Sequence, residues 1–296
     1  MQKVGSPLME RPKFSVLLPT HNRADVVGAS IASILNQIFQ DFEILVVGDG
    51  CTDETADVIA SFDDQRIRWF DLPKGEGFGY GNRNHALAEG ELTACAAHDD
   101  LMLLDHLQLM ATLFDARPRI QWAYCRPLWI DDEGTIIPFF LNLEANQAYQ
   151  RFMRDYNSLP AGCVVHRRSC FEKAGMWPVN VKEAGDWDMW RRIIGAYGRS
   201  ALAVQRTPTQ LHFRAHWRDP DNWAPRPLAY LKAMSQRKSN WPAALKLPLN
   251  ANQPPQLQVQ SMMRDDPRMF AGRLRNGVAR LQDDIAWEAT LDSNFF

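Results

Sequence analysis

Two adjacent carboxylates, Asp99 and Asp100, follow the small and apolar run 93–97. The run predicts a short buried strand, and open α/β sheets bind ligands at the carboxyl ends of their strands. Hard divalent ions such as Mg²⁺ or Mn²⁺ prefer oxygen ligands and are often held by one or two carboxylates together with substrate phosphates. We therefore predict a metal site at Asp99 and Asp100, with His98 beside it. Either carboxylate could instead cap the following helix.

Polar side chains also follow the first two predicted strands. The turn after the first strand consists of Pro19, Thr20, His21, Asn22 and Arg23. The backbone N–H groups of such a turn, and the helix N-terminus after it, suit an anion or a nucleotide. Asp49 ends the second strand between two glycines, so we expect its carboxylate to project freely and to accept hydrogen bonds from a ribose or a base edge. Turn formation alone also accounts for a Gly-Asp-Gly sequence.

A glycine-rich loop, with glycine at every second position from 75 to 81, precedes Arg83. It contains no G-x-G-x-x-G window and does not follow the first strand, so a dinucleotide fingerprint is unsupported. A mobile segment that brings Arg83 to a phosphate or a base fits better, because arginine offers planar bidentate donors. A surface position on a helix over 82–88 is the alternative.

Asp186 and Asp188 open a predicted helix that Gly198 ends. At about 100° per residue the two carboxylates point about 200° apart, so only one can face a site. Asp186 shares its face with the apolar Trp190, whereas Asp188 is spaced for surface ion pairs with Arg191 and Arg192. Asp186 is therefore the predicted inward carboxylate, and helix capping remains compatible with that position.

Alternating strands and helices connect these segments. The predicted strands are 14–18, 43–47, 67–70 and 93–97, and the predicted helices are 24–37, 52–62 and 82–88. Such alternation predicts an α/β fold with a doubly wound, mostly parallel sheet. A helix over 106–114 and strands over 121–125 and 135–139 follow. Residues 217–296 predict a C-terminal helical appendage, helical over 266–290, that packs on the core or on a second subunit of a homo-oligomer.

The bulk composition is that of an ordinary soluble enzyme. The 296 residues are 46% hydrophobic and carry a formal charge of −2, which gives no electrostatic footprint for nucleic acid. The five cysteines form no CxxC pair, so free thiols in a reducing compartment are expected. The sequence has neither an apolar signal core nor an apolar run of about 18 residues. We therefore expect a cytoplasmic protein without a transmembrane segment.

These blocks, in this order, resemble the inverting family 2 glycosyltransferases with the A-type fold (the nucleotide-diphospho-sugar transferase fold) over roughly residues 13–217. The family's Pro-Thr-x-Asn-Arg turn is matched by residues 19–23, and its nucleotide-binding Asp by Asp49. Its Ala-Arg-Asn segment is matched in part by Arg83 and Asn84. The resemblance implies a nucleotide-binding half over 13–105 and an acceptor-binding half of the same domain over 106–216.

Two acids of the family pattern are replaced in this chain. The Asp-x-Asp metal motif falls on Ala97-His98-Asp99, which leaves Asp99 as the main metal ligand. The catalytic Glu-Asp pair falls on Gly185-Asp186, so the base is kept and its companion is lost. A late Arg-x-His resembles Arg214-Ala215-His216, although His212 is a second imidazole that could reach a metal or a diphosphate. The resemblance therefore implies Asp99, Asp100 and His216 as metal ligands.

The implied reaction is metal-dependent transfer of a sugar from a nucleotide-diphosphate sugar, a UDP-sugar first of all, to an acceptor hydroxyl. Mn²⁺ or Mg²⁺ would stabilise the departing diphosphate, and Asp186 would take the acceptor proton. The acceptor would be a glycan, a lipid-linked saccharide or a small molecule. Two alternatives stay open: a non-catalytic relative that binds nucleotide sugars, and a nucleotidyltransferase, which would need a glycine-rich Arg/Lys loop directly after the first strand.

Overall fold

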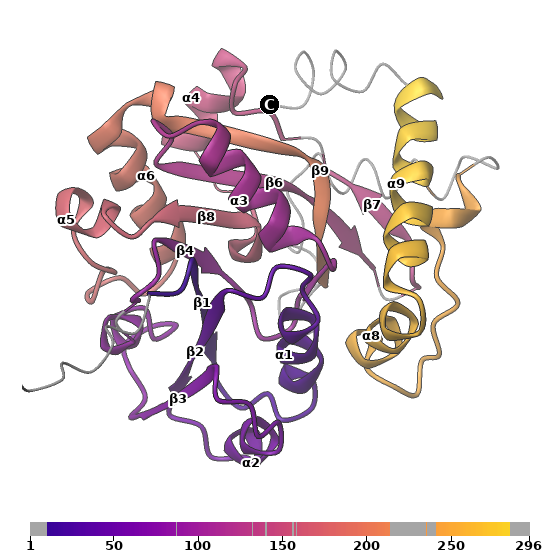
Figure 1. Cartoon of the computed structure of the whole chain (residues 1–296), viewed down its shortest axis with the longest axis horizontal. Helices are drawn as coiled ribbons and strands as arrows, with labels where there is room; N and C mark the ends of the chain where they lie inside the picture. Colours follow the sequence, from indigo (N-terminus) through magenta and orange to yellow (C-terminus); the bar gives the residue numbers. More distant parts are fainter. Residues whose placement is uncertain are drawn as a thin grey trace, which may run out of the picture.

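The computed structural model describes residues 11–86, 88–131, 133–139, 141–155, 157, 159–213, 235 and 241–284. Within them a nine-stranded sheet has the order β3-β2-β1-β4-β8-β6-β9-β5, with β7 paired to β6 (Figure 1). The strands are β1 (Phe14–Thr20), β2 (Phe42–Asp49), β3 (Ile67–Leu72), β4 (Leu92–Cys95), β5 (Leu101–Met102), β6 (Trp122–Ile130), β7 (Ile136–Pro138), β8 (Val164–Arg167) and β9 (Leu202–Phe213). The main helices are α1 (Val27–Leu35), α2 (Thr55–Ala60), α3 (His106–Ala116), α4 (Asn146–Arg154), α5 (Cys170–Ala174), α6 (Gly185–Tyr197), α8 (Pro255–Asp265) and α9 (Pro267–Asp284).

The first half of the sheet is the predicted parallel α/β unit. Strand β1 pairs in parallel with both β2 and β4, and β2 pairs in parallel with β3. All eight residues of β2 are buried, which is the continuous apolar pattern of a strand covered on both faces. Because these strands run the same way, the loops after β1, β2 and β4 meet at one edge of the sheet.

The second half is mixed and joins the first directly. Strand β8 runs antiparallel to both β4 and β6, and β9 runs parallel to β6 but antiparallel to β5. Sequence patterning misses β9 because its middle, Gln205–Pro208, is polar and contains a proline, and its pairing with β6 shifts register there. The predicted nucleotide-binding and acceptor-binding halves therefore share one sheet.

The helix predicted over 82–88 is wrong in type and length. The structure has a short 3₁₀ helix, η1, over Gly81–His85. The side chain of Asn82 donates to Asp49 and to the carbonyl of Pro73, and the side chain of Asn84 bonds to the backbone of Trp177. Such side-chain bonds to neighbouring loops compete with a regular helix.

The described part of the appendage packs on its own chain. Figure 1 places α8 and α9 together at one side of the molecule, and α8 contacts α1. Arg275 of α9 forms a bidentate pair with Asp105, at 2.7 and 2.8 Å. Sequence patterning misses α8, which precedes the helix predicted over 266–290. In α9 the side chain of Phe270 is buried and that of Met269 is exposed.

We expect Leu274→Ala to lower the free energy of unfolding by about 2–5 kcal/mol, because Leu274 is fully buried in α9 and its truncation leaves a cavity. Met269→Ala on the same helix is the control, since this side chain is 68% exposed and should stay within about 0.5 kcal/mol of wild type. Urea denaturation measures both. Equal losses would mean that α9 does not pack as described.

His166 in β8 gives the fold a defined pH dependence. Its side chain is fully buried, and burial lowers its pKa to about 4, below the ordinary 6.5. Between these two values the unfolded chain binds more protons than the folded one, so stability falls as the pH drops from 6.5 towards 4.

We expect His166→Leu to flatten the dependence of the unfolding free energy on pH over this interval, whatever the variant does to stability at pH 7. His85→Leu, at an exposed histidine, should leave the slope unchanged. Urea denaturation at half-unit pH steps measures it. An unchanged slope in His166→Leu would contradict a neutral, buried imidazole.

Within the described residues, no helix is both long enough and apolar enough to cross a bilayer.

Candidate functional site

The loops after β1 and β2 are bonded to each other at the carboxyl edge of the parallel strands. Nδ1 of His21 donates to the carbonyl of Asp49 at 2.7 Å, and Oδ1 of Asn22 accepts from the N–H of Thr52 at 2.7 Å. Asn22 adopts φ of 48°, a left-handed conformation that asparagine tolerates. Pro19 and Thr20 of the predicted turn are the last residues of β1, which is longer than predicted, and His21 and Asn22 bond to the end of β2 and the loop after it.

Asp99 lies against the same turn, as its place after β4 predicts. Nη1 of Arg23 is 3.5 Å from Oδ2 of Asp99, and Nε2 of His98 is 4.0 Å from the same oxygen. Burial lowers the pKa of His98, because it disfavours the charged imidazolium. Arg23, His98 and Asp99 therefore form one cluster with a neutral imidazole.

The carboxylate of Asp100 bonds to the end of β9 and not to the cluster around Asp99. Its Oδ1 accepts from the backbone N–H of Phe213 at 3.0 Å, and its Oδ2 is 2.8 Å from Nδ1 of His212. Burial raises the pKa of Asp100, and the neighbouring His212 opposes that shift. Both carboxylate oxygens of Asp100 are thus engaged by residues at the end of β9. Arg214 and His216 lie outside the described residues.

Asp49 does not project freely, and that expectation was wrong. Its carboxylate is buried and accepts from the N–H of Gly75 at 2.7 Å and from Nδ2 of Asn82 at 2.8 Å. Lys74 forms an ion pair with the other carboxylate oxygen. A Cβ at Gly79, where φ is +63°, would lie 2.6 Å from Oδ1 of Asp49. The glycine-rich loop therefore packs directly on Asp49.

Sequence reasoning missed the ion pair of Lys74 with Asp49. The only signal for it was the position of a lysine at the start of the glycine-rich loop, directly after the third strand.

Helix α6 presents its two acids as the helical spacing predicts. Asp186 forms an ion pair with the buried Arg83, whereas Oδ2 of Asp188 pairs with Nε of Arg192 at 2.8 Å on the surface. Arg191, the other predicted partner of Asp188, instead has its guanidinium carbon 4.8 Å from the ring centroid of Trp187. The burial of Arg83 contradicts the alternative of a surface charge.

Asp186 also lies near the end of β4. Burial raises the pKa of Cys95 in β4 to about 12, and the negative charge of Asp186 contributes to that shift. Asp99 follows four residues after Cys95. The charge of Asp186 thus acts on the last residue of the strand that precedes Asp99.

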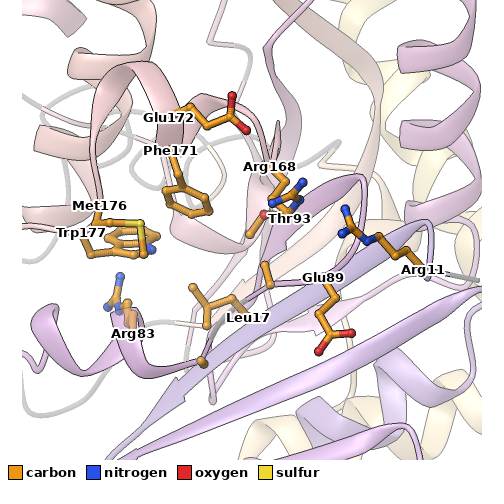
Figure 2. A pocket seen from close by; sticks show the side chains of 12 residues that line it. Arg11, Leu17, Arg83, Glu89, Thr93, Arg168, Phe171, Glu172, Met176 and Trp177 are labelled. Atoms are coloured by element: carbon orange, nitrogen blue, oxygen red, sulfur yellow. The ribbon is translucent and has the colours of Figure 1, made fainter. Parts of the chain in front are cut away.

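A cavity of about 370 Å³ is lined in part by Arg83. Figure 2 shows Arg83 and Trp177 at one end of it, Phe171 above, and Leu17 and Thr93 of the sheet between them and the far end. The volume is within the range of small-molecule sites. Arg83 thus both lines this cavity and pairs with Asp186.

The side chains at this edge suit a hard cation shared with a substrate. Among the described residues, no three or more His, Cys, Asp or Glu side chains are grouped to hold an ion. Asp99 offers one carboxylate, already partly balanced by Arg23. This donor set fits Mg²⁺ or Mn²⁺ bound through one carboxylate and the phosphates of a ligand rather than by a complete protein cage.

Comparisons with known proteins agree on the fold. An uncharacterized glycosyltransferase of Rickettsia typhi is 27% identical over 195 residues, which are 62% of this chain and 59% of that protein. A GalNAc(5)-diNAcBac-PP-undecaprenol beta-1,3-glucosyltransferase of Campylobacter jejuni is 38% identical over 96 residues, 31% of each chain. This chain thus spans less than two thirds of the length of either relative. The crystal structure of S. aureus TarS 1-349 in complex with UDP-GlcNAc matches 88% of this chain and 72% of its own, with a TM-score of 0.59 and 18% identity.

The family assignment rests on a family model that matches more than half of the chain. Residues 15–173, from β1 through α5, match the model for glycosyl transferase family 2. That stretch contains the turn after β1, Asp49, the glycine-rich loop and Asp99 in the order described above. This chain belongs to glycosyl transferase family 2.

Proposed function

We propose that this chain transfers a sugar from a nucleotide-diphosphate sugar to an acceptor hydroxyl with inversion at the anomeric carbon. The observation that carries the proposal is the ion pair that turns Asp186 of α6 inward onto the buried Arg83, in a chain whose strand β4 is followed by Asp99. One carboxylate is thereby available as a base and the other as a ligand for the donor's metal. A single displacement needs both at one site.

Each residue at the edge has a role in this proposal. Asp99 would hold Mn²⁺ or Mg²⁺, which when bound neutralises charge on the diphosphate. The turn Pro19–Arg23 and His98 would contact the donor phosphates. Asp49 would contact the nucleoside by exchanging one of its present bonds to Lys74, Gly75 or Asn82.

Asp186 would act as the general base. As the acceptor oxygen forms its bond to the anomeric carbon, the bond from that carbon to the diphosphate oxygen breaks and its electron pair leaves with the diphosphate. The acceptor proton passes to a carboxylate oxygen of Asp186. A positioned base of this kind typically contributes about 10²–10⁴-fold in rate.

The relatives suggest which substrates to test first. The Escherichia coli protein named UDP-Glc:alpha-D-GlcNAc-diphosphoundecaprenol beta-1,3-glucosyltransferase is 31% identical over 101 residues. Its name supports a UDP-sugar donor, and both its name and that of the Campylobacter relative support a lipid-linked saccharide acceptor. Free glycans and small molecules remain part of the proposal, as does a cytoplasmic location.

A non-catalytic, nucleotide-sugar-binding role is the second candidate. It is favoured by Ala97 and Gly185, which stand where the family pattern has acids, and by the engagement of Asp49 and Asp186 with Lys74 and Arg83. UDP release from a panel of UDP-sugars, measured with Mn²⁺ and with or without each acceptor class, separates the two candidates. Acceptor-dependent release supports transfer, and donor binding without release across all acceptors supports the binding-only role.

A further inference from the structure

Gly185, the residue before Asp186, has no side chain because another residue occupies the space. A Cβ built at Gly185 would lie 2.6 Å from both Cδ atoms of the Tyr80 ring, closer than real Cβ atoms approach their neighbours. Tyr80 is itself buried. The aromatic ring thus fills the place that any side chain at position 185 would need.

The same ring is one wall of an aromatic cage around Arg83. The guanidinium carbon of Arg83 lies 4.6 Å from the ring centroid of Tyr80 and 4.6 Å from that of Trp177. All three side chains are more than nine-tenths buried. Stacking of a guanidinium on aromatic faces stabilises it most where water is excluded. The cage therefore fixes where the guanidinium of Arg83 points.

Two further bonds hold the cage together. Nδ2 of Asn84 donates to the carbonyl of Trp177 at 3.0 Å, and the N–H of Trp177 donates to Oδ1 of Asn84 at 2.9 Å. This reciprocal pair fastens η1, which carries Arg83, to the loop that carries Trp177. The guanidinium that this cage holds forms the ion pair with the carboxylate of Asp186.

We propose that Tyr80, Arg83 and Trp177 are positioning residues for Asp186: the cage aims the guanidinium of Arg83, and the guanidinium holds the carboxylate in the orientation that accepts the acceptor proton. This inference rests on the proposed role of Asp186 as the base. It assigns Arg83 to the base rather than to the donor phosphates. Gly185 and Tyr80 are then a matched pair, because neither can change alone without displacing the cage.

Steady-state kinetics distinguish the two roles of Arg83. We expect Arg83→Met to lower kcat by about 100-fold with little change in the KM for the donor, since a misplacement of about 1 Å can cost that much. Arg83→Lys should lose about 10-fold, because an ammonium cannot stack and bridge as a guanidinium does. A raised donor KM with kcat retained would overturn the proposal and return Arg83 to donor binding.

Chemical rescue distinguishes a loss of activity caused by the missing guanidinium group from one caused by damage to the fold. Because Arg83 lines a solvent-accessible cavity, guanidinium ion at low millimolar concentration can enter the space left in Arg83→Ala. Partial recovery of kcat by guanidinium, but not by equal tetramethylammonium, supports the proposal. No recovery in a variant that retains the circular dichroism spectrum and donor binding of wild type would overturn it.

The glycine gives an independent test with a control on the same helix. Gly185→Ala should lower kcat about 10-fold or more, while Gly195→Ala, where a Cβ would meet nothing within 4 Å, should not. In a Tyr80→Ala background, Gly185→Ala should cause no further loss, because the overlap is gone. Additive losses would contradict the matched pair. If Asp186→Asn remains active, the proposed function fails instead, whatever these variants do.

Discussion

Asp186→Asn is expected to lower turnover by about 10²–10⁴-fold, the usual contribution of a positioned general base. The amide keeps the shape of the side chain and can bond to neighbours, but it cannot accept the acceptor proton. The donor's dissociation constant should stay near the wild-type value, because in the proposed site the donor is placed by the residues at the ends of β1, β2 and β4. Initial rates with saturating donor, together with calorimetric titration of the donor, measure both quantities.

Asp188→Asn is the matched control, two residues further along α6. Its carboxylate pairs with Arg192 on the surface, and an exposed pair of this kind contributes about 0–1 kcal/mol. Turnover should be unchanged. The melting temperature of each variant should be measured together with its kinetics. Asp186→Asn also removes the ionic partner of the buried Arg83, so it can lower the stability of the fold. Loss of turnover in Asp188→Asn with activity retained in Asp186→Asn would require a different base.

Asp99→Ala should abolish metal-dependent donor binding while the fold is retained. In the proposed site Asp99 is the carboxylate that holds the ion, and the cationic Arg23 beside it cannot bind a metal in its place. Thermal shift is a sensitive readout, since a donor at about 100 times its dissociation constant adds about 2.7 kcal/mol of stability. The Mn²⁺-dependent part of that shift should disappear in the variant.

Asp25→Ala controls for the loss of a carboxylate beside Arg23. Nε of Arg23 is 3.0 Å from Oδ1 of Asp25, whose side chain is 56% exposed. This variant should keep the full metal-dependent shift. Retention of Mn²⁺-dependent affinity in Asp99→Ala would move the ion to Asp100, His212 or His216.

The first half of the fold was predictable because its signals are local. Buried strands such as β2 and helices such as α1 appear as apolar runs and apolar periods within fewer than a dozen residues. The turn after β1 and the acids after β2 and β4 follow directly from those strand ends. Helical spacing likewise separates Asp186 from Asp188 without reference to the rest of the chain.

The partners of these acids were not predictable, because they come from distant parts of the chain. Asp100 meets His212 across 112 residues, and Arg83 meets Asp186 across 103. The sequence around residues 82–88 does not show that the side chains of Asn82 and Asn84 bond to other loops. Those bonds accompany the short 3₁₀ helix that replaces the predicted one. The burial of the Asp49 carboxylate was not predictable either, because it depends on where the glycine-rich loop packs.

Strand β9 has a consequence for how the protein is made. Its end supplies Phe213 to Asp100 and pairs with β5, so the segment that carries the predicted metal ligand is completed by residues synthesised more than 100 positions later. Pairings of such large sequence separation slow folding, because a long loop must close before the contact forms. A nascent chain or fragment that ends before β9 therefore lacks the contacts that hold Asp100 in place. The bond from Phe213 to Asp100 can form only after residue 213 has been synthesised.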